Sequence, residues 1–195
     1  MRKIKMKFII KMILISVVLM GCSSEFTNRS AINQSFPSVR GKTLSGNSIQ
    51  LPDHFKGEVV LLLLGFVQNS QFDIDRWLIG LDQRGVKIKI YEIPTIKGFW
   101  PSLFKNQIDN GMRKGIPEEL WKIVITIYKD GEKVQKLFGN KNPNNARVIL
   151  LNEDGKIDYF YDRGFSVSAL NNVIELVDTK KHVNQLKPAE PLRNK

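Results

Sequence analysis

This sequence of 195 residues has one cysteine, Cys22, and two histidines, His54 and His182. A single thiol forms neither an intramolecular disulfide nor a redox pair, and two isolated histidines without a cysteine cluster do not make a transition-metal site. The chain also has no glycine-rich phosphate loop, and Glu153-Asp154 lacks the alternating oxygen ligands of a calcium loop. We therefore predict no metal, no cofactor and no catalytic residue.

Acidic residues are fewer than basic ones, 19 against 30, which gives a formal net charge of +11. Residues 1–21 contain five of the basic residues and no acidic one, so the rest of the chain carries +6. Such a mild excess is not a nucleic-acid signature, and it is typical of a solvated, lysine-rich surface. The alternative is a basic face directed at anionic lipid or at an acidic protein partner.

The chain begins with the pattern of an export signal. A basic stretch over residues 1–7 precedes an apolar run over residues 8–20, and this run is too short and too basic for a good membrane span. The stretch Leu19-Met20-Gly21-Cys22 resembles the lipobox of bacterial lipoproteins. This resemblance implies that residues 1–21 are a removed signal peptide and that Cys22 carries a diacylglycerol.

A lipid on Cys22 would hold the protein on the extracytoplasmic side of a membrane in the cell envelope. Two or more acyl chains make such an attachment lasting. Ser23 stands where an aspartate, in many two-membrane bacteria, signals retention in the inner membrane, so we expect the outer membrane, facing the periplasm. Two alternatives stay open: an ordinary secretory signal, or an uncleaved anchor, with an incidental cysteine.

The remaining chain divides into three parts. Residues 22–35 are mostly small and polar, which predicts a flexible tether, and residues 179–195 lose the apolar pattern, which predicts a disordered basic tail. Residues 36–178 have the length of a single domain. The expected elements of this domain are a β-hairpin over 39–44 and 48–51, a buried strand over 58–66, a helix from Ser70, a strand from Val86, a helix over 97–114, a helical turn at 117–121, a strand over 123–128, an amphipathic piece over 132–138, a β-hairpin over 147–151 and 156–161, and a helix capped by Ser166.

The start of the first helix contains a serine that invites a catalytic interpretation. Ser70 is followed three positions later by Asp73, which is the spacing of a capping box. No histidine falls where it would serve Ser70 as a general base, so we interpret this serine as a helix cap. Trp77 lies on the apolar stripe of the same helix and is expected in the core.

The order of these elements resembles the thioredoxin fold as built in peroxiredoxins and their relatives. The stretches Gly41-Lys42-Thr43-Leu44 and Leu51-Pro52-Asp53 are similar to the entry of such a domain. Residues 148–157 are similar to its hydrophobic strand, acidic-glycine turn and Lys-Ile restart. The resemblance covers residues 36–178 and implies a single α/β domain with a thioredoxin-like fold, an N-terminal β-hairpin and a helical insert.

Within that superfamily the sequence resembles the mitochondrial ATP synthase assembly factor family and its bacterial relatives. The supporting residues are Trp77, the stretch 111–117, Leu137-Phe138-Gly139-Asn140 and Gly164. This resemblance implies a chaperone-like or assembly role at a membrane, without a catalysed reaction.

The sequence departs from the redox members at the positions that carry their chemistry. Asn69 and Phe72 stand at about the places of the two loop cysteines, and neither forms a thiolate. Active sites of this fold place a cis-proline directly before the third strand, whereas this chain has Ala146 there and Pro143 three positions too early. The fold is thus expected to be kept while its redox site is lost.

Aromatic residues of the insert are the candidates for a partner surface. Phe99, Trp100 and Trp121 lie in or near the inserted helices, where core packing is the alternative. We expect a redox-inactive binding or assembly factor, in one version for a respiratory or ATP synthase complex. The rivals are a thiol oxidoreductase or peroxiredoxin-like enzyme that uses an unlipidated Cys22, and a structural envelope lipoprotein.

Overall fold

The computed structural model describes residues 25–98 and 103–186, and within them the strands form two sheets. The larger sheet has the order β4-β3-β6-β7. Its strands are β3 (Val60–Gly65), β4 (Lys89–Pro94), β6 (Arg147–Leu151) and β7 (Ile157–Tyr161). The smaller sheet has the order β2-β1-β5, with β1 (Val39–Thr43), β2 (Ser48–Leu51) and β5 (Ile125–Thr126).

The apolar run around residue 60 forms the centre of the larger sheet, as predicted. All six residues of β3 are buried because both faces of this strand are covered. β3 pairs in parallel with β4, and the helix α2 (Gln71–Gln83) connects these two strands along the chain. β3 also pairs antiparallel with β6, which pairs antiparallel with β7. The predicted parallel crossover and both predicted hairpins are confirmed.

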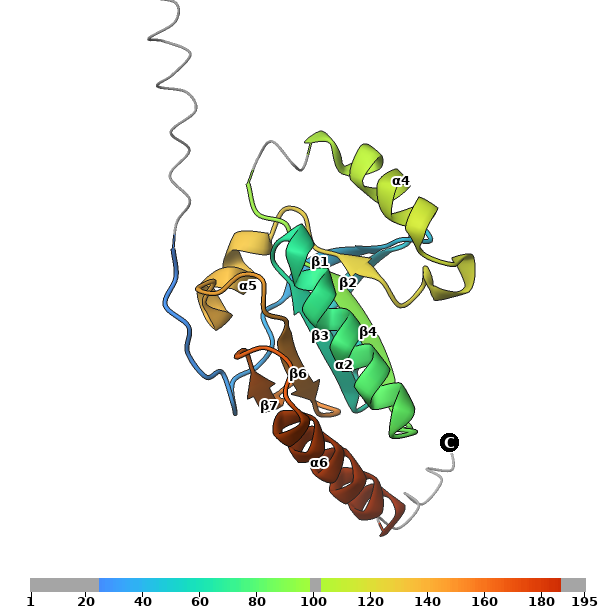
Figure 1. Ribbon diagram of the computed structural model, residues 1–195, viewed down its shortest axis with the longest axis vertical. Helices are drawn as coiled ribbons and strands as arrows, with labels where there is room; N and C mark the ends of the chain where they lie inside the picture. The colour runs from blue at the N-terminus through green and yellow to red at the C-terminus, as the bar shows by residue number, and fades with distance from the viewer. Residues whose placement is uncertain (1–24, 99–102, 187–195) are drawn as a thin grey trace, which may run out of the picture.

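Two helices cover one face of the larger sheet. They are α2 and α6 (Val167–Leu186), which lie side by side in front of the strands in Figure 1. Trp77 is fully buried beneath them, as predicted, and its ring meets Phe165 and Tyr161 edge-on. The side chain of Ser166 caps α6, since its hydroxyl accepts the Ala169 N–H at 3.2 Å.

The opposite face is covered by the smaller sheet, by the short helix α5 (Gly131–Phe138) and by η1 (Asp53–Phe55). β5 joins the two sheets, because Val124 and Ile127 form isolated parallel bridges with Glu92 and Thr95. Phe138 of α5 stacks on Phe160 at a centroid distance of 5.5 Å.

The insert between β4 and β5 differs from the predicted helix over 97–114. Its helix, α4, begins at Lys105 and ends at Gly115, and the turn η3 (Glu118–Leu120) follows. Figure 1 shows α4 at the upper right of the fold. The only buried residue of α4 is Asp109, whereas Leu103 and Phe104, which precede it, are 55% and 53% exposed.

Both ends of the domain extend further than the sequence predicted. Residues 25–35, the described part of the expected tether, run along the domain and bury Ala31 completely. The backbone of Asn33 donates a hydrogen bond to Ile157 at 2.8 Å. At the other end α6 continues to Leu186, although the apolar pattern stops near residue 178, because helical backbone hydrogen bonds do not require a buried face. Residues 187–195 of the expected tail lie outside the described residues.

Candidate functional site

The predicted redox loop follows β3 and contains the turn η2 (Gln68–Ser70). Asn69 is exposed in this turn, and Phe72, in the first turn of α2, is 70% exposed. Ala146, the third predicted position, is fully buried directly before β6. Two of the three predicted positions are therefore exposed to solvent, and the third is buried beneath the loop.

Ser70 does not act as the helix cap that its spacing with Asp73 predicted. Its backbone is already helical, and its hydroxyl donates to the Val67 carbonyl at 2.6 Å instead of accepting a helix N–H. The side chain is buried against Gly65, where an added Cβ would lie 2.4 Å from the Ser70 Oγ. The serine stabilises the turn after β3 and has no base beside it.

Asp73 joins three parts of the chain beneath this loop. One carboxylate oxygen accepts the Ala146 N–H at 2.8 Å, and the other accepts the Phe165 N–H at 2.7 Å. Only 6% of Asp73 is exposed. The sequence suggested a capping-box partner for Ser70, whereas the structure shows a carboxylate that fixes the loops before β6 and α6.

Arg147, which sequence reasoning missed, is a fully buried cation at the start of β6. Its guanidinium donates to four backbone carbonyls, at distances of 2.7 to 3.2 Å. These carbonyls belong to Gly139, Lys141, Asn142 and Asn145. The guanidinium also lies 4.7 Å from the centre of the Phe66 ring. Burial lowers the pKa of Arg147 to about 10, which still leaves it charged at neutral pH. Arg147 thus shapes the loop 139–146 from below.

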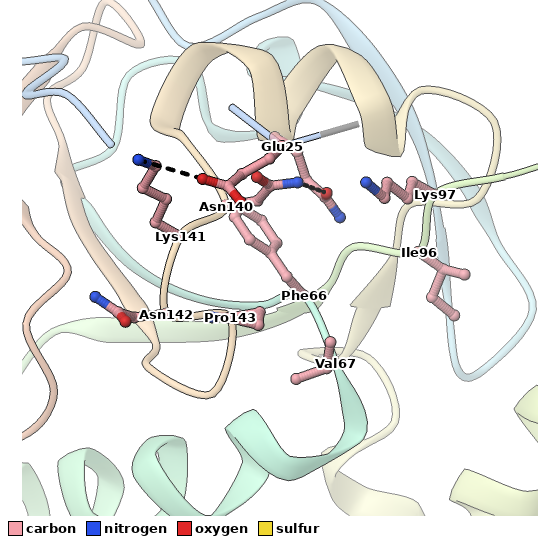
Figure 2. Close-up of a pocket in the computed structure, with 10 residues that line it drawn as sticks. Glu25, Phe66, Val67, Ile96, Lys97, Asn140, Lys141, Asn142 and Pro143 are labelled. Atoms are coloured by element: carbon pink, nitrogen blue, oxygen red, sulfur yellow. Dashed lines mark hydrogen bonds and ion pairs between the residues drawn. The ribbon is translucent and has the colours of Figure 1, made fainter. Parts of the chain in front are cut away.

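A pocket of about 610 Å³ opens above this loop, at the ends of β3 and β4 (Figure 2). Its walls are Glu25, Phe66, Val67, Ile96, Lys97, Gln135, Asn140, Lys141, Asn142 and Pro143. The lining combines two ammonium groups, three amide side chains and one carboxylate. Lys141 pairs with Glu25 at 3.2 Å, and both side chains are more than half exposed. This arrangement suits an anionic ligand held by ammonium and amide donors.

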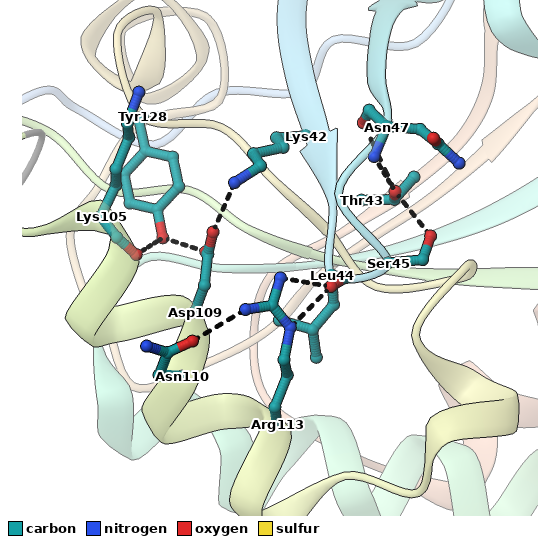
Figure 3. A network of polar contacts seen from close by, with 10 residues as sticks. All are labelled: Lys42, Thr43, Leu44, Ser45, Asn47, Lys105, Asp109, Asn110, Arg113 and Tyr128. Carbon is teal, nitrogen blue, oxygen red and sulfur yellow. Dashed lines mark hydrogen bonds and ion pairs between the residues drawn. The ribbon is translucent and has the colours of Figure 1, made fainter.

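A second polar cluster holds α4 to the body of the protein (Figure 3). The Asp109 carboxylate accepts from the Lys42 ammonium at 3.0 Å and from the Tyr128 hydroxyl at 2.5 Å. Burial raises the pKa of Tyr128, and its hydrogen bond to Asp109 raises it further. Arg113 donates to the Leu44 carbonyl with two nitrogens, at 2.9 and 2.7 Å.

The predicted partner residues lie away from the pocket, as far as the structure describes them. Trp121 is half-buried: its ring nitrogen donates to the Ile116 carbonyl at 2.9 Å, and the Arg113 guanidinium lies 5.4 Å from its ring. Phe99 and Trp100 lie outside the described residues. The exposed apolar side chains of the insert are Leu103, Phe104 and Leu120.

These features define a single α/β domain with a thioredoxin-like fold. Solved structures support this: a SCO1/SenC family lipoprotein from Bacillus anthracis str. Ames is 13% identical with a TM-score of 0.53, over 78% of this chain and 98% of that one. Yeast Sco1 with copper bound is 12% identical with a TM-score of 0.50, over 84% and 99%. The thioredoxin domain of a thiol-disulfide oxidoreductase from Bacteroides vulgatus is 21% identical with a TM-score of 0.47, over 76% and 99%. No protein-family model matches the sequence, and no curated protein does.

The loop after β3 does not offer the donors that copper prefers. Its side chains, including Asn69 and Phe72, supply neither thiolate nor imidazole. Within residues 25–98 and 103–186, no three side chains of His, Cys, Asp or Glu gather closely enough to hold a metal ion. Over the same residues, no helix is long and apolar enough to cross a bilayer.

Proposed function

We propose that this protein is a lipid-anchored, redox-inactive thioredoxin-like domain that acts as a binding or assembly factor in the cell envelope and catalyses no reaction. Assembly of a respiratory or ATP synthase complex is one version of this role, taken from the family resemblance. The observation that carries the proposal is the content of the former redox site. Asn69 and Phe72 present an amide and a phenyl ring to solvent, while Asp73 ties Ala146 to the helix.

Assays of thiol and peroxide chemistry test the lack of catalysis. The mature chain with Cys22→Ser is expected neither to reduce insulin nor to consume peroxide. The matched control adds Asn69→Cys and Phe72→Cys, whose thiols should react with a thiol reagent because both positions are exposed. Turnover by the thiol-free chain would contradict the proposal.

The anchor at Cys22 is proposed from the resemblance to the lipobox. Mass spectrometry of the N-terminus of the protein made in bacterial cells should find a diacylglyceryl group on Cys22. A free thiol there would instead support the rival oxidoreductase. Membrane fractionation tests the expected place in the outer membrane, facing the periplasm, since inner-membrane recovery would contradict it.

The partner is proposed to be a protein that contacts the insert around α4. Leu103, Phe104 and Leu120 are exposed there, and the predicted partner residues Phe99 and Trp100 precede Leu103 closely in the sequence. A photoreactive residue at Trp100, in the native host, should crosslink to one stoichiometric partner. A structural spacer, the third hypothesis, should give no such product, and the same probe at Lys156, at the far end of the sheet, serves as the matched control.

A further inference from the structure

The first described residues bring the pocket close to the proposed lipid attachment point. Glu25 forms part of the pocket wall, and only three chain steps separate it from Cys22. An extended chain covers at most about 3.6 Å per residue, so these steps reach about 11 Å. A tether released at residue 35 would reach more than four times as far.

Residues 25–29 are fixed to the loop that lines the pocket. Phe26 and Asn140 exchange two hydrogen bonds, since the Phe26 N–H donates to the Asn140 side chain at 2.7 Å and the Asn140 N–H donates to the Phe26 carbonyl at 2.9 Å. Asn28 and Lys141 exchange two more, at 2.8 and 3.0 Å. The side chain of Arg29 donates to the Leu137 and Lys136 carbonyls. This pairing keeps the distance between anchor and pocket short.

The fit is also tight where this segment crosses the start of the loop. Gly139 has a φ of +79°, and a Cβ there would lie 2.3 Å from the Asn28 Cα. The segment and the loop therefore lie in backbone contact, as a close approach of this kind requires glycine.

We infer that the mouth of this pocket faces the bilayer and that the pocket receives the phosphate of an anionic phospholipid headgroup. The inference rests on the lipid anchor of the proposed function. Lys97 and Lys141 supply the positive charge, of which Lys141 also pairs with Glu25 at 3.2 Å. The Asn142 amide supplies a further donor, whereas the Asn140 amide is held in the wall by its hydrogen bonds with Gln135 and Phe26. The pocket volume lies within the range of about 300 to 1,000 Å³ that small-ligand sites occupy.

Electrostatics favours this orientation because of the short reach of the chain. The Debye length at physiological salt is about 8 Å, so a membrane charge attracts lysines only when they lie near the surface. Each such lysine strengthens binding to an anionic membrane by roughly fivefold. Lys97 and Lys141 at the pocket therefore contribute to binding, whereas lysines at the far end of the sheet do not.

Vesicle binding of the unlipidated chain tests the headgroup site without the anchor. The mature chain with Cys22→Ser should sediment with vesicles of phosphatidylcholine and phosphatidylglycerol, and much less with phosphatidylcholine alone. Lys97→Gln with Lys141→Gln should weaken binding by at least about tenfold. The matched control is Lys87→Gln with Lys156→Gln. It gives the chain the same net charge but removes lysines from the opposite end of the larger sheet, where β3 begins.

Two outcomes of this assay would overturn the inference. Equal losses in both pairs would mean binding by net charge only. If the chain bound soluble glycerol phosphate in the pocket but showed no preference for the anionic vesicles, the pocket would be assigned to a free anion.

The lipidated chain tests the orientation. With Cys22 acylated, an introduced cysteine is the only thiol, so a fluorophore can be placed at Val67, in the pocket wall, or at the exposed Asp154 in the far turn. Energy transfer to a headgroup-labelled lipid should be strong from Val67→Cys and weak from Asp154→Cys. The reverse would overturn the inference and leave the lipid anchor intact. An unmodified Cys22 in mass spectrometry would instead contradict the proposed function.

Discussion

Replacing Arg147 tests whether a buried cation stabilises the loop under the pocket. Arg147→Met keeps most of the buried volume and removes the guanidinium that serves four backbone carbonyls. We expect unfolding to occur at lower urea concentration and amide exchange in residues 139–146 to become faster. The reason is that the carbonyls would lose charge-assisted donors in a site where water has little access.

The magnitude follows from two opposing effects. Burial lowers the pKa of Arg147 from its ordinary value to about 10, which at about 1.4 kcal/mol for each pKa unit opposes the charged form by about 3 kcal/mol. Hydrogen bonds from a charged donor contribute about 1.5 to 3 kcal/mol each. Even at the low end, four such bonds contribute about 6 kcal/mol and exceed the desolvation by about 3 kcal/mol, so we expect a loss of at least about 3 kcal/mol.

The sign of the pH dependence is fixed by the same pKa. Above about pH 10 the folded chain releases a proton that the unfolded chain still binds, so this group makes stability rise with pH there. Arg147→Lys keeps the charge but reaches fewer carbonyls, so it should lose about 1 to 3 kcal/mol and stay folded if the methionine variant does not. A methionine variant as stable as the parent in urea would refute the reasoning, because desolvation would then exceed the hydrogen bonds.

Three further predictions concern the surroundings of the site. Tyr128→Phe removes the hydroxyl that donates to Asp109 at 2.5 Å, so it should lower stability by about 1 to 3 kcal/mol and speed amide exchange in α4; unchanged exchange would contradict this. Gly131→Ala places a Cβ 2.2 Å from the Ile96 carbonyl oxygen and should lower stability by about 1 to 3 kcal/mol, whereas the same change at a glycine of α4 with open space around it should not. Burial raises the pKa of Glu92 above 4.5, so the folded state binds more protons there and stability falls as pH rises; Glu92→Gln should flatten this fall in thermal melts from pH 4.5 to neutral pH.

Local patterns in the sequence were sufficient for most of the core. The unbroken apolar run of β3 predicted a strand covered on both faces, and the stripe that contains Trp77 predicted the buried face of α2. The turn at Asp154-Gly155 predicted the hairpin of β6 and β7. These predictions were right because burial shapes each pattern directly: a strand covered on both faces is apolar throughout, and a helix covered on one face repeats its apolar residues every 3.6 positions.

The same patterns were misleading where polar residues are buried. Nothing in the pattern over residues 97–114 pointed to Asp109, yet it is the residue that α4 buries, against Lys42, which is 67 positions away. The sequence near Asp73 suggested a helix cap, yet its partners are 73 and 92 positions distant. A partner so far along the chain leaves no local trace in the sequence.

The sequence by itself determined which reactive side chains the domain contains and predicted the order of its elements. One cysteine at position 22 leaves no thiol in the domain, whatever its fold, because composition does not depend on conformation. Only the tertiary structure decided that residues 25–35 pack on the domain and that Arg147 organises the loop beneath the pocket. Both depend on hydrogen bonds to backbone groups, which every residue carries and which side-chain identity therefore does not reveal.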